Sequence, residues 1–513
     1  MKHLLLSTLL LLLVACSPEE EVASLNPPGY ELDAAAAGPS AGLFYSFYSD
    51  AREPRSLTDA TVADSLYVWL ESEAPIVQVR FTVDTPPVSE RVERYLPYSL
   101  GGDRGVGRLF PYDFSQLSPG VHTVVAEVLF EGQETAQPVT ASFTVEETIT
   151  YQEPIVITQG GTYRGNWRSY DPEVPAVEVK TTEPVVIENT TVRGPGNLIY
   201  LRPGYASNVT IRNVRGYGEN PNVVSQRTGR FIAAYHCQWL SVEHCYLEGT
   251  GGILLYDAQD GATVKIRYNQ ARNIDGRLSD GNNGYLIDKP RIKDYAQFVQ
   301  LDICDELVDA EVAWNQVIND PFKSRPEDNI NTYKSNGTPG SPLLIHNNYV
   351  QGAYPNDPTN TPFYSGGGII LGDGGGSYQR AYDNQVVATT NYAVSIAGGQ
   401  DNAFYRNRAV SSGYLPDGRY IAAQNVGMYI WNQYDPPFGQ AKAYDNVSGW
   451  VKSPDGTRRN DYWIKDTDGQ REAALWENNR SIEGPITQNT EQAEWTSWQE
   501  KLRQTGVTVG PKQ

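Results

Sequence analysis

The sequence predicts an all-β protein whose larger part is a parallel β-helix. Three observations support this: a unit of two short alternating strands returns many times, an Asn closes each copy, and no stretch of helical period separates the copies. In the clearest copy, residues 251–269, Ile253 and Leu255 alternate with outward positions and Asn269 follows the second strand. Such alternation predicts half-buried strands, and coils of this size must stack to bury their apolar faces.

The asparagines that close the copies recur at intervals of 23 to 46 residues. They are Asn269, Asn315, Asn348, Asn384, Asn407, Asn446 and Asn479, with Cys245 at the same position one coil earlier. Because an amide both donates and accepts hydrogen bonds, we expect these side chains to bond from coil to coil inside the solenoid. A doubly wound sheet would need crossover helices, and a propeller would need four strands per repeat, so neither fits.

The N-terminus carries the features of an export signal. Lys2 precedes a Leu-rich run that ends in Leu13, Val14, Ala15 and Cys16, after which the chain becomes polar. The run is too short to span a membrane and resembles a bacterial lipoprotein signal. The resemblance implies a signal peptide over residues 1–15 and a lipid on Cys16; a plain secretory signal is the alternative. The acidic, Pro- and Ala-containing residues 16–40 predict a flexible stalk.

Residues 41–148 predict a β-sandwich, because short alternating strands are separated by turn-rich segments. The stretches 79–84, 97–103 and 117–123 resemble the immunoglobulin-like modules of bacterial surface proteins that act on glycans. Such modules serve as spacers or, less often, as carbohydrate binders. The β-helix is expected over 149–485. In the final segment, 486–513, Trp495, Trp498 and Leu502 have helical spacing, which predicts an amphipathic helix that caps the last coil.

The coil pattern over residues 150–485 resembles the right-handed parallel β-helix proteins of the pectate-lyase-like superfamily. The resemblance rests on coil shape and on the recurring Asn, which specify fold better than activity. The Trp-Ile-Asp-His stretch and downstream basic motif of pectate lyases are not found, nor is the paired-Asp motif of polygalacturonase-type hydrolases. No catalytic residue is therefore transferred from the family.

The composition of the chain limits the ligands and partners that it can bind. A net charge of −20 argues against nucleic acid, which requires a basic face. It is compatible with Ca²⁺ as a cofactor but locates no site. Only Cys237, Cys245 and Cys304 accompany Cys16, so the chain has no disulfide framework; Cys237 and Cys245 could pair or stay as buried thiols. We also expect a monomer.

Aligning the coils on the second apolar residue of their first strand predicts a functional edge of the solenoid. The aligned residues are Leu201, Ala234, Leu255, Leu301, Thr332, Leu371, Ile396, Ile430 and Ile464. Because adjacent strands lie about 4.8 Å apart, the residues that follow should stack in a column. The candidates for catalysis are His236, Asp257, Asp302, Lys334 and Asp373, and those for substrate binding are Arg202, Tyr256, Tyr333 and Trp431. The long insertions 272–295, 351–367 and 411–424 should wall this edge into a groove for a polymer.

Two reactions on an extracellular polysaccharide fit these residues. In β-elimination, Lys334 would be the base and Arg202 or an Asp-held metal would neutralise the substrate carboxylate. Hydrolysis needs two carboxylates, and next-but-one coils would separate them by about 9 to 10 Å, near the upper end of the inverting range. Asp257 and Asp302, on adjacent coils, would be too close for inversion.

We expect a surface-anchored carbohydrate-active protein, outside the cytoplasm, that acts as a lyase rather than a hydrolase. Two alternatives stay open. The polar turn residues could simply face water, and the β-helix could be a rigid, non-catalytic rod of the cell envelope or of adhesion.

Overall fold

The structure is a computed structural model. It describes residues 41–512, apart from gaps at 47–48, 50, 52–53, 63–64, 85–86, 104–107, 146–148, 288–295, 435–437, 454–457, 466–468 and 472–473. The predicted signal peptide and stalk, with Cys16, lie outside the described residues. The chain divides into two compact units between Thr148 and Ile149.

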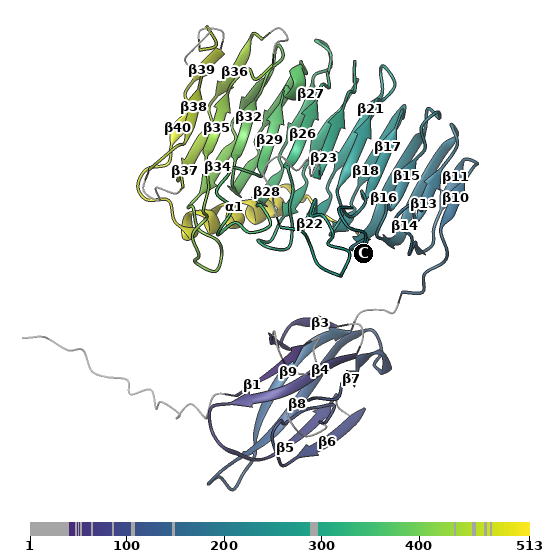
Figure 1. Cartoon of the computed structure of the whole chain (residues 1–513), viewed down its shortest axis with the longest axis vertical. Coiled ribbons are helices and arrows are strands. Elements are labelled where there is room, and N and C mark those ends of the chain that lie inside the picture. The colour runs from purple at the N-terminus through teal and green to yellow at the C-terminus, as the bar shows by residue number, and fades with distance from the viewer. Residues whose placement is uncertain are drawn as a thin grey trace, which may run out of the picture. The chain divides into compact units, whose positions relative to one another are not determined.

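The first unit contains a four-stranded sheet of order β2-β1-β4-β7 and a five-stranded sheet of order β3-β9-β8-β5-β6 (Figure 1). Apolar residues at alternate positions of the longer strands, such as Val79, Phe81 and Val83 in β5, form its buried core. The elements are β1 Ala41–Ser46, β2 Arg55–Ser56, β3 Ala60–Val62, β4 Ser65–Ser72, β5 Ile76–Val83, β6 Ser89–Glu93, β7 Tyr112–Asp113, the 3₁₀ turn η1 Phe114–Gln116, β8 Gly120–Phe130 and β9 Gln137–Val145.

The second unit consists mainly of two large parallel sheets, of eleven and twenty strands, and is consistent with a parallel β-helix (Figure 1). Each coil contributes one strand to the first sheet, and most contribute two to the second. The eleven-stranded sheet contains β10 Ile155–Ile157, β13 Val177–Val179, β15 Ile199–Leu201, β17 Ile232–Tyr235, β20 Ile253–Tyr256, β23 Gln297–Asp302, β26 Asp328–Tyr333, β29 Gly367–Leu371, β32 Tyr392–Ile396, β35 Val426–Ile430 and β38 Tyr462–Ile464.

The twenty-stranded sheet has two neighbouring ladders, and β14 Pro184–Gly194 and β16 Asn208–Gly218 run through both. One ladder contains β11 Gly161–Tyr163, β18 Trp239–Glu243, β21 Thr263–Arg267, β24 Glu311–Ala313, β27 Leu343–His346, β30 Gln379–Tyr382, β33 Ala403–Tyr405, β36 Ala441–Tyr444 and β39 Ala474–Glu477. The other contains β12 Trp167–Arg168, β19 Tyr246–Glu248, β22 Gln270–Arg272, β25 Gln316–Ile318, β28 Tyr349–Ala353, β31 Gln385–Thr389, β34 Arg408–Ser411, β37 Val447–Trp450 and β40 Arg480–Ser481.

The register predicted from the apolar alternation is confirmed in the eleven-stranded sheet. The observed pairs are Leu201 with Ala234, Ala234 with Leu255, Leu255 with Leu301, Leu301 with Thr332, Leu371 with Ile396, Ile396 with Ile430 and Ile430 with Ile464. Of these residues all but Thr332 and Ile464 belong to the continuous buried core that runs through the coils. The strand ends therefore stack as the sequence predicts.

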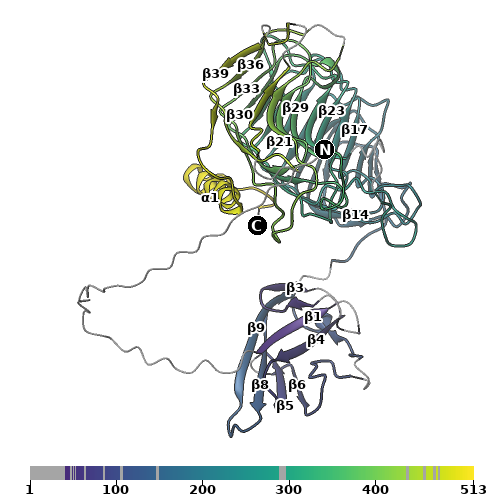
Figure 2. The ribbon, with the colours of Figure 1, turned by 60° about the vertical axis from the view of Figure 1, so that its left-hand side comes forward.

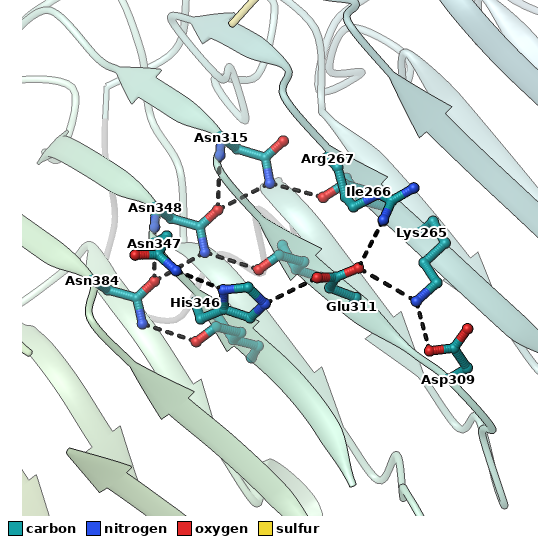
Figure 3. A network of polar contacts seen from close by, with 12 residues as sticks. Lys265, Ile266, Arg267, Asp309, Glu311, Asn315, His346, Asn347, Asn348 and Asn384 are labelled. Carbon is teal, nitrogen blue, oxygen red and sulfur yellow. Dashed lines mark hydrogen bonds and ion pairs between the residues drawn. The ribbon is translucent and has the colours of Figure 1, made fainter. Parts of the chain in front are cut away.

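The predicted asparagine ladder is confirmed as well (Figure 3). The Asn348 Oδ1 accepts hydrogen bonds from the backbone and side-chain nitrogens of Asn315, at 3.0 and 2.9 Å, and the Asn315 Nδ2 also donates to the Ile266 carbonyl at 2.9 Å. The pattern repeats from coil to coil as far as Asn479. It begins at Cys245, whose N–H donates to the Asn269 Oδ1 at 2.9 Å. Cys245, Cys237 and Cys304 are buried thiols.

The C-terminal helix forms where the sequence predicts but lies elsewhere. Helix α1, Gln488–Thr505, buries Trp498, whose Nε1 donates to the Gln316 Oε1 at 3.0 Å. Arg408 in β34 donates to the Glu494 carboxylate. The helix therefore lies along the side of the stacked coils and does not cap the last one, so that prediction was wrong (Figure 2).

The reason is an apolar strip on the outside of the second sheet. Tyr349, Val387 and Leu415 form a cluster there with Trp498, and Trp495 and Leu502 pack against it. The helix removes the apolar surface of these side chains from water, which favours its position along the side of the coils. Within the described part of the chain, no helix has both the length and the apolar character needed to cross a bilayer.

Candidate functional site

The predicted column lies along one edge of the eleven-stranded sheet. Tyr235, Tyr256, Asp302 and Tyr333 occupy one row of paired positions on β17, β20, β23 and β26. The residues that follow them, His236, Asp257, Ile303 and Lys334, all have a left-handed backbone, with φ between 47° and 55°. Each of their N–H groups donates to a carbonyl of the next coil. The same turn, repeated four times, brings these side chains to one edge.

His236 and Asp257 form a surface pair at the early end of this edge. The His236 Nε2 lies 3.1 Å from the Asp257 Oδ2, and the two side chains are 36% and 54% exposed. The rings of Tyr235 and Tyr256 lie beside each other, with centroids 5.6 Å apart. Because His236 and Asp257 are exposed, water strongly screens the interaction between them.

Lys334, Asp302 and Asp373 lie farther along the same edge. The Lys334 N–H donates to the Asp373 carbonyl at 2.7 Å, while its Nζ lies 5.3 Å from the centre of the Tyr333 ring. The Asp302 carboxylate accepts from the Gln300 Nε2 at 3.3 Å. Burial raises the pKa of Asp302, which the nearby Asp373 charge raises further and the cations Arg230 and Lys334 lower.

The structure does not bring Arg202 to Lys334. Arg202 follows β15, and its Nη1 lies 2.9 Å from the Glu178 Oε1. Four strand pairings separate β15 from β26, or about 19 Å at the usual spacing. Arg202 therefore cannot neutralise a substrate carboxylate on which Lys334 acts.

A cleft of about 670 Å³ opens over the later coils of the same sheet. Of the predicted site residues it contains Asp373 and Trp431, and the predicted insertion 351–367 supplies part of its wall. Its lining residues include Arg325, Glu327, Asp328, Tyr364, Ile370, Asp373, Tyr392, Tyr429, Trp431, Tyr434, Lys452, Arg458 and Trp463. Three kinds of side chain thus meet here: carboxylates, aromatic rings and cations.

Two carboxylates on neighbouring coils share one amide in the cleft: Asp328 begins β26, and Asp373 lies in the 3₁₀ turn η2, Asp373–Gly375, after β29. The Asn331 Nδ2 donates to the Asp328 Oδ2 at 3.0 Å and to the Asp373 Oδ2 at 2.9 Å. Because both oxygens bond to the same nitrogen, they lie within about 6 Å of each other. The Tyr392 hydroxyl donates to the other oxygen of Asp328, and the Tyr434 hydroxyl donates to the other oxygen of Asp373. Both carboxyl groups are held in fixed orientations.

Glu327 adds a third carboxyl beside this pair. The Gln297 Nε2 donates to its Oε2 at 2.7 Å. Burial raises the pKa of Glu327 well above the usual range, and the charges of Asp328 and Asp373 raise it further. Burial also raises the pKa of Asp328, although the hydrogen bonds from Tyr392 and Asn331 oppose it. The cleft can therefore hold a protonated and an ionised carboxyl side by side near neutral pH.

Aromatic rings and cations form the rest of the cleft. Trp431 and Trp463 are 37% and 42% exposed, and their rings meet edge to face at 5.7 Å. Exposed indole faces present flat apolar surfaces of the kind that stack on sugar rings. Arg325, Lys452 and Arg458 add positive charge to the cleft lining.

Aligning the coils with one another did not predict five residues of the cleft network: Glu327, Asp328, Asn331, Tyr392 and Tyr434. The predicted site contains only residues that follow the aligned residue of each coil. Asp328 instead lies four residues before Thr332, the aligned residue of its coil. A usable signal was present, because polar residues in β23 and β26, such as Gln300 and Asn331, alternate with buried apolar ones in register. Polar residues on a covered strand face point to a network or a site.

The side chains of the cleft do not locate a site for Ca²⁺, with which the net charge is compatible. Among the described residues, no group of three or more His, Cys, Asp and Glu side chains is arranged to hold a metal ion.

Comparison of the chain with protein-family models and with curated proteins gave no match.

Proposed function

We propose that this protein is carbohydrate-active: it binds an extracellular polysaccharide along the outward face of the eleven-stranded sheet and cleaves it in the cleft. The observation that carries the proposal is the pair Asp328 and Asp373, joined by the Asn331 amide beside exposed indoles. Cleaving a glycosidic bond requires one carboxyl as acid and another as base or nucleophile, at a fixed separation. The aromatic rings would hold the sugar over them.

The carboxylates favour hydrolysis over the elimination that the sequence favoured. The Asp328 and Asp373 oxygens, within about 6 Å, are nearer the separation of about 5 to 5.5 Å in retaining glycosidases than the wider inverting range. In such a reaction the buried Glu327 or Asp328 would protonate the leaving oxygen, and Asp373 would attack or activate water. Elimination would instead use Lys334, with a cation of the cleft as neutraliser.

A panel of uronate-containing and neutral polysaccharides separates the two reactions. Hydrolysis yields reducing ends without ultraviolet absorbance, whereas elimination also yields unsaturated ends that absorb. We expect reducing ends alone, lost in Asp373→Asn and kept in Lys334→Ala. Absorbance that disappears in Lys334→Ala would establish elimination and overturn the carboxylate mechanism.

A second candidate is binding without cleavage. It is favoured by one observation, that both oxygens of Asp328 and of Asp373 accept hydrogen bonds within the protein. The coils would then form a rigid glycan- or protein-binding rod of the cell envelope. No product from the panel, together with retention on a polysaccharide that is lost in Trp431→Ala, would support this candidate.

The finer architectural predictions belong to the same proposal. The parallel sheets are compatible with the right-handed, pectate-lyase-like β-helix, and the two-sheet N-terminal unit with an immunoglobulin-like spacer. A lipid on Cys16 would keep the monomer at the bacterial envelope, where polysaccharides are accessible. Incorporation of radiolabelled palmitate, abolished in Cys16→Ala, tests the anchor.

A further inference from the structure

Arg230 is a buried cation beneath the proposed binding face. Its side chain is 4% exposed, and its backbone N–H donates to the Asn197 Oδ1 at 2.9 Å. It stands two residues before Ile232, and strand pairing places Gly251 and Gln297 at the corresponding positions of the next two coils. Burying a guanidinium is costly unless hydrogen bonds and opposite charges compensate it.

The glycine in the intervening coil gives Arg230 its path. A Cβ at Gly251 would lie 3.2 Å from the Arg230 Cδ, closer than ordinary packing allows. The guanidinium therefore extends past this coil, where its Nη1 donates to the Gly251 carbonyl, and reaches β23 in the following one. A side chain two residues before β17 thus contacts two glutamines in β23.

Each glutamine links Arg230 to a carboxylate. The Arg230 Nη2 donates to the Gln297 Oε1 and to the Gln300 Oε1, both at 3.0 Å. The opposite ends of these amides donate to Glu327 at 2.7 Å and to Asp302 at 3.3 Å. An amide between a cationic donor and an accepting carboxyl oxygen has one orientation that satisfies both, so each glutamine is fixed at both ends.

We propose that Arg230 is a positioning residue of the cleft, which through Gln297 holds the Glu327 carboxyl and through Gln300 holds the Asp302 carboxyl. As a cation one amide away, it also favours the ionised form of both groups and opposes the effect of their burial. The inference builds on the proposed function, because Glu327 lines the proposed catalytic cleft. The ionisation of Glu327 can nevertheless be measured without a substrate.

Other charges act on the same groups and enter the test. Asp328 and Asp373 raise the pKa of Glu327, and Arg325 and Arg230 lower it. Asp373 raises the pKa of Asp302, and Arg230 and Lys334 lower it. Burial lowers the pKa of Arg230 and the charge of Arg227 lowers it further, whereas Tyr235, Glu327 and Asp302 raise it. The Arg230→Met variant keeps all of these other groups. It therefore removes only the contribution of Arg230 to the pKa values of Glu327 and Asp302.

The test follows the unfolding free energy of the full chain from pH 4 to pH 10 in wild type and Glu327→Gln, and in the same pair carrying Arg230→Met. Within each pair, the difference reports the ionisation of Glu327. Between the pKa values of the unfolded and folded states only the folded protein holds this proton, so stability relative to the Gln variant falls as pH rises through that window. We expect Arg230→Met to move the upper end of the window to higher pH by about one unit.

Single-amide variants test the two arms separately. Gln297→Leu keeps the cation but breaks the link to Glu327, and we expect it to shift the window in the same direction; it also serves if Arg230→Met does not fold. Gln300→Leu is the matched control and should leave the Glu327 window unchanged. An unchanged window in both Arg230→Met and Gln297→Leu, or an equal shift in Gln300→Leu, would overturn the assignment.

Activity separates this inference from the function on which it builds. If the polysaccharide panel gives product, the pH profile of cleavage should shift in Arg230→Met and recover in part in Arg230→Lys, which a merely structural role would not produce. If the panel gives no product and the window still shifts, the proposed function fails and the positioning role stands. If product forms but neither the window nor the pH profile moves, the positioning role fails alone.

Discussion

Two buried polar arrays run through the coils, and they differ in charge. The asparagine ladder is neutral, and each amide repeats the same bonds to its neighbours and to a backbone carbonyl. The array around Asn331 joins carboxyl groups, and burial raises the pKa of Glu327 and Asp328. A neutral, fully bonded array specifies a fold. Buried carboxyls in a cleft add little stability and are candidates for a functional site.

The largest effect on this comparison should come from Asn384→Ala. The Asn384 side chain accepts two hydrogen bonds from Asn348 and donates to the Ile345 carbonyl and to Asn407. All four hydrogen bonds are buried. We expect a loss of about 3 to 5 kcal/mol in the free energy of unfolding, measured by urea denaturation, because several buried groups lose their partners. The exposed Asn282→Ala is the control, with less than about 0.5 kcal/mol. A similar small loss at Asn384 would contradict a structural ladder.

In contrast to Asn384→Ala, the substitution Asp373→Asn should reduce activity and leave stability nearly unchanged. The Asn side chain keeps the size of the carboxyl group but removes its charge, so the free energy of unfolding should change little. Cleavage of the polysaccharide found by the panel should fall at least about a hundredfold, or about 2.7 kcal/mol in transition-state stabilisation. Steady-state rates from reducing-end release measure it. Retained activity would remove Asp373 from the proposed mechanism.

Glu311 extends the comparison to a charged group beside the ladder. The hydrogen bond with His346 lowers the pKa of Glu311 to about 2; burial opposes this shift, and Lys265 and Arg267 support it (Figure 3). Because the folded pKa is below the unfolded one, the stabilisation is present above about pH 4.5 and is lost as pH falls through about 2. We expect Glu311→Gln to cost about 1 to 2 kcal/mol at pH 7, after allowing for solvent screening.

The pH dependence provides the check on Glu311. Urea denaturation at pH 7, 4 and 2.5 should show the gap between wild type and Glu311→Gln closing as the pH falls. Glu306→Gln, an exposed substitution in the same unit, is the control. A gap that stays constant with pH would mean that the ion pairs do not stabilise the fold.

The smallest effect is expected at Trp431→Ala. Removing an exposed indole from the cleft takes away a stacking surface without leaving a cavity in the core. We expect KM to rise about fivefold to tenfold, about 1 kcal/mol, with kcat nearly unchanged, since stacking holds substrate and transition state alike. Val156→Ala, an exposed position on the first strand of the same sheet, should leave both constants unchanged. A selective loss of kcat would give Trp431 a different role.

Local pattern was enough to predict much of the scaffold. Alternation located the strands and their register through Leu255 and Ile430, and the recurring Asn predicted the internal ladder, because each feature repeats within one coil. The spacing of Trp495 and Trp498 predicted the helix in the final segment, 486–513. Its position was not predicted, because the apolar strip it covers is assembled from Tyr349, Val387 and Leu415, which are far apart in the chain.

By itself, the sequence determined which residues reach the edge of the solenoid, since strand period and left-handed turns are local properties. Only the tertiary structure decided which of them share a buried environment. Asp328 meets Tyr392, and Arg230 meets Gln297, 64 and 67 residues away along the chain. Both pairs join next-but-one coils, and the insertions between those coils set their separation along the chain. Burial and neighbouring charge, which set the pKa of a carboxyl group, exist only once those coils have stacked.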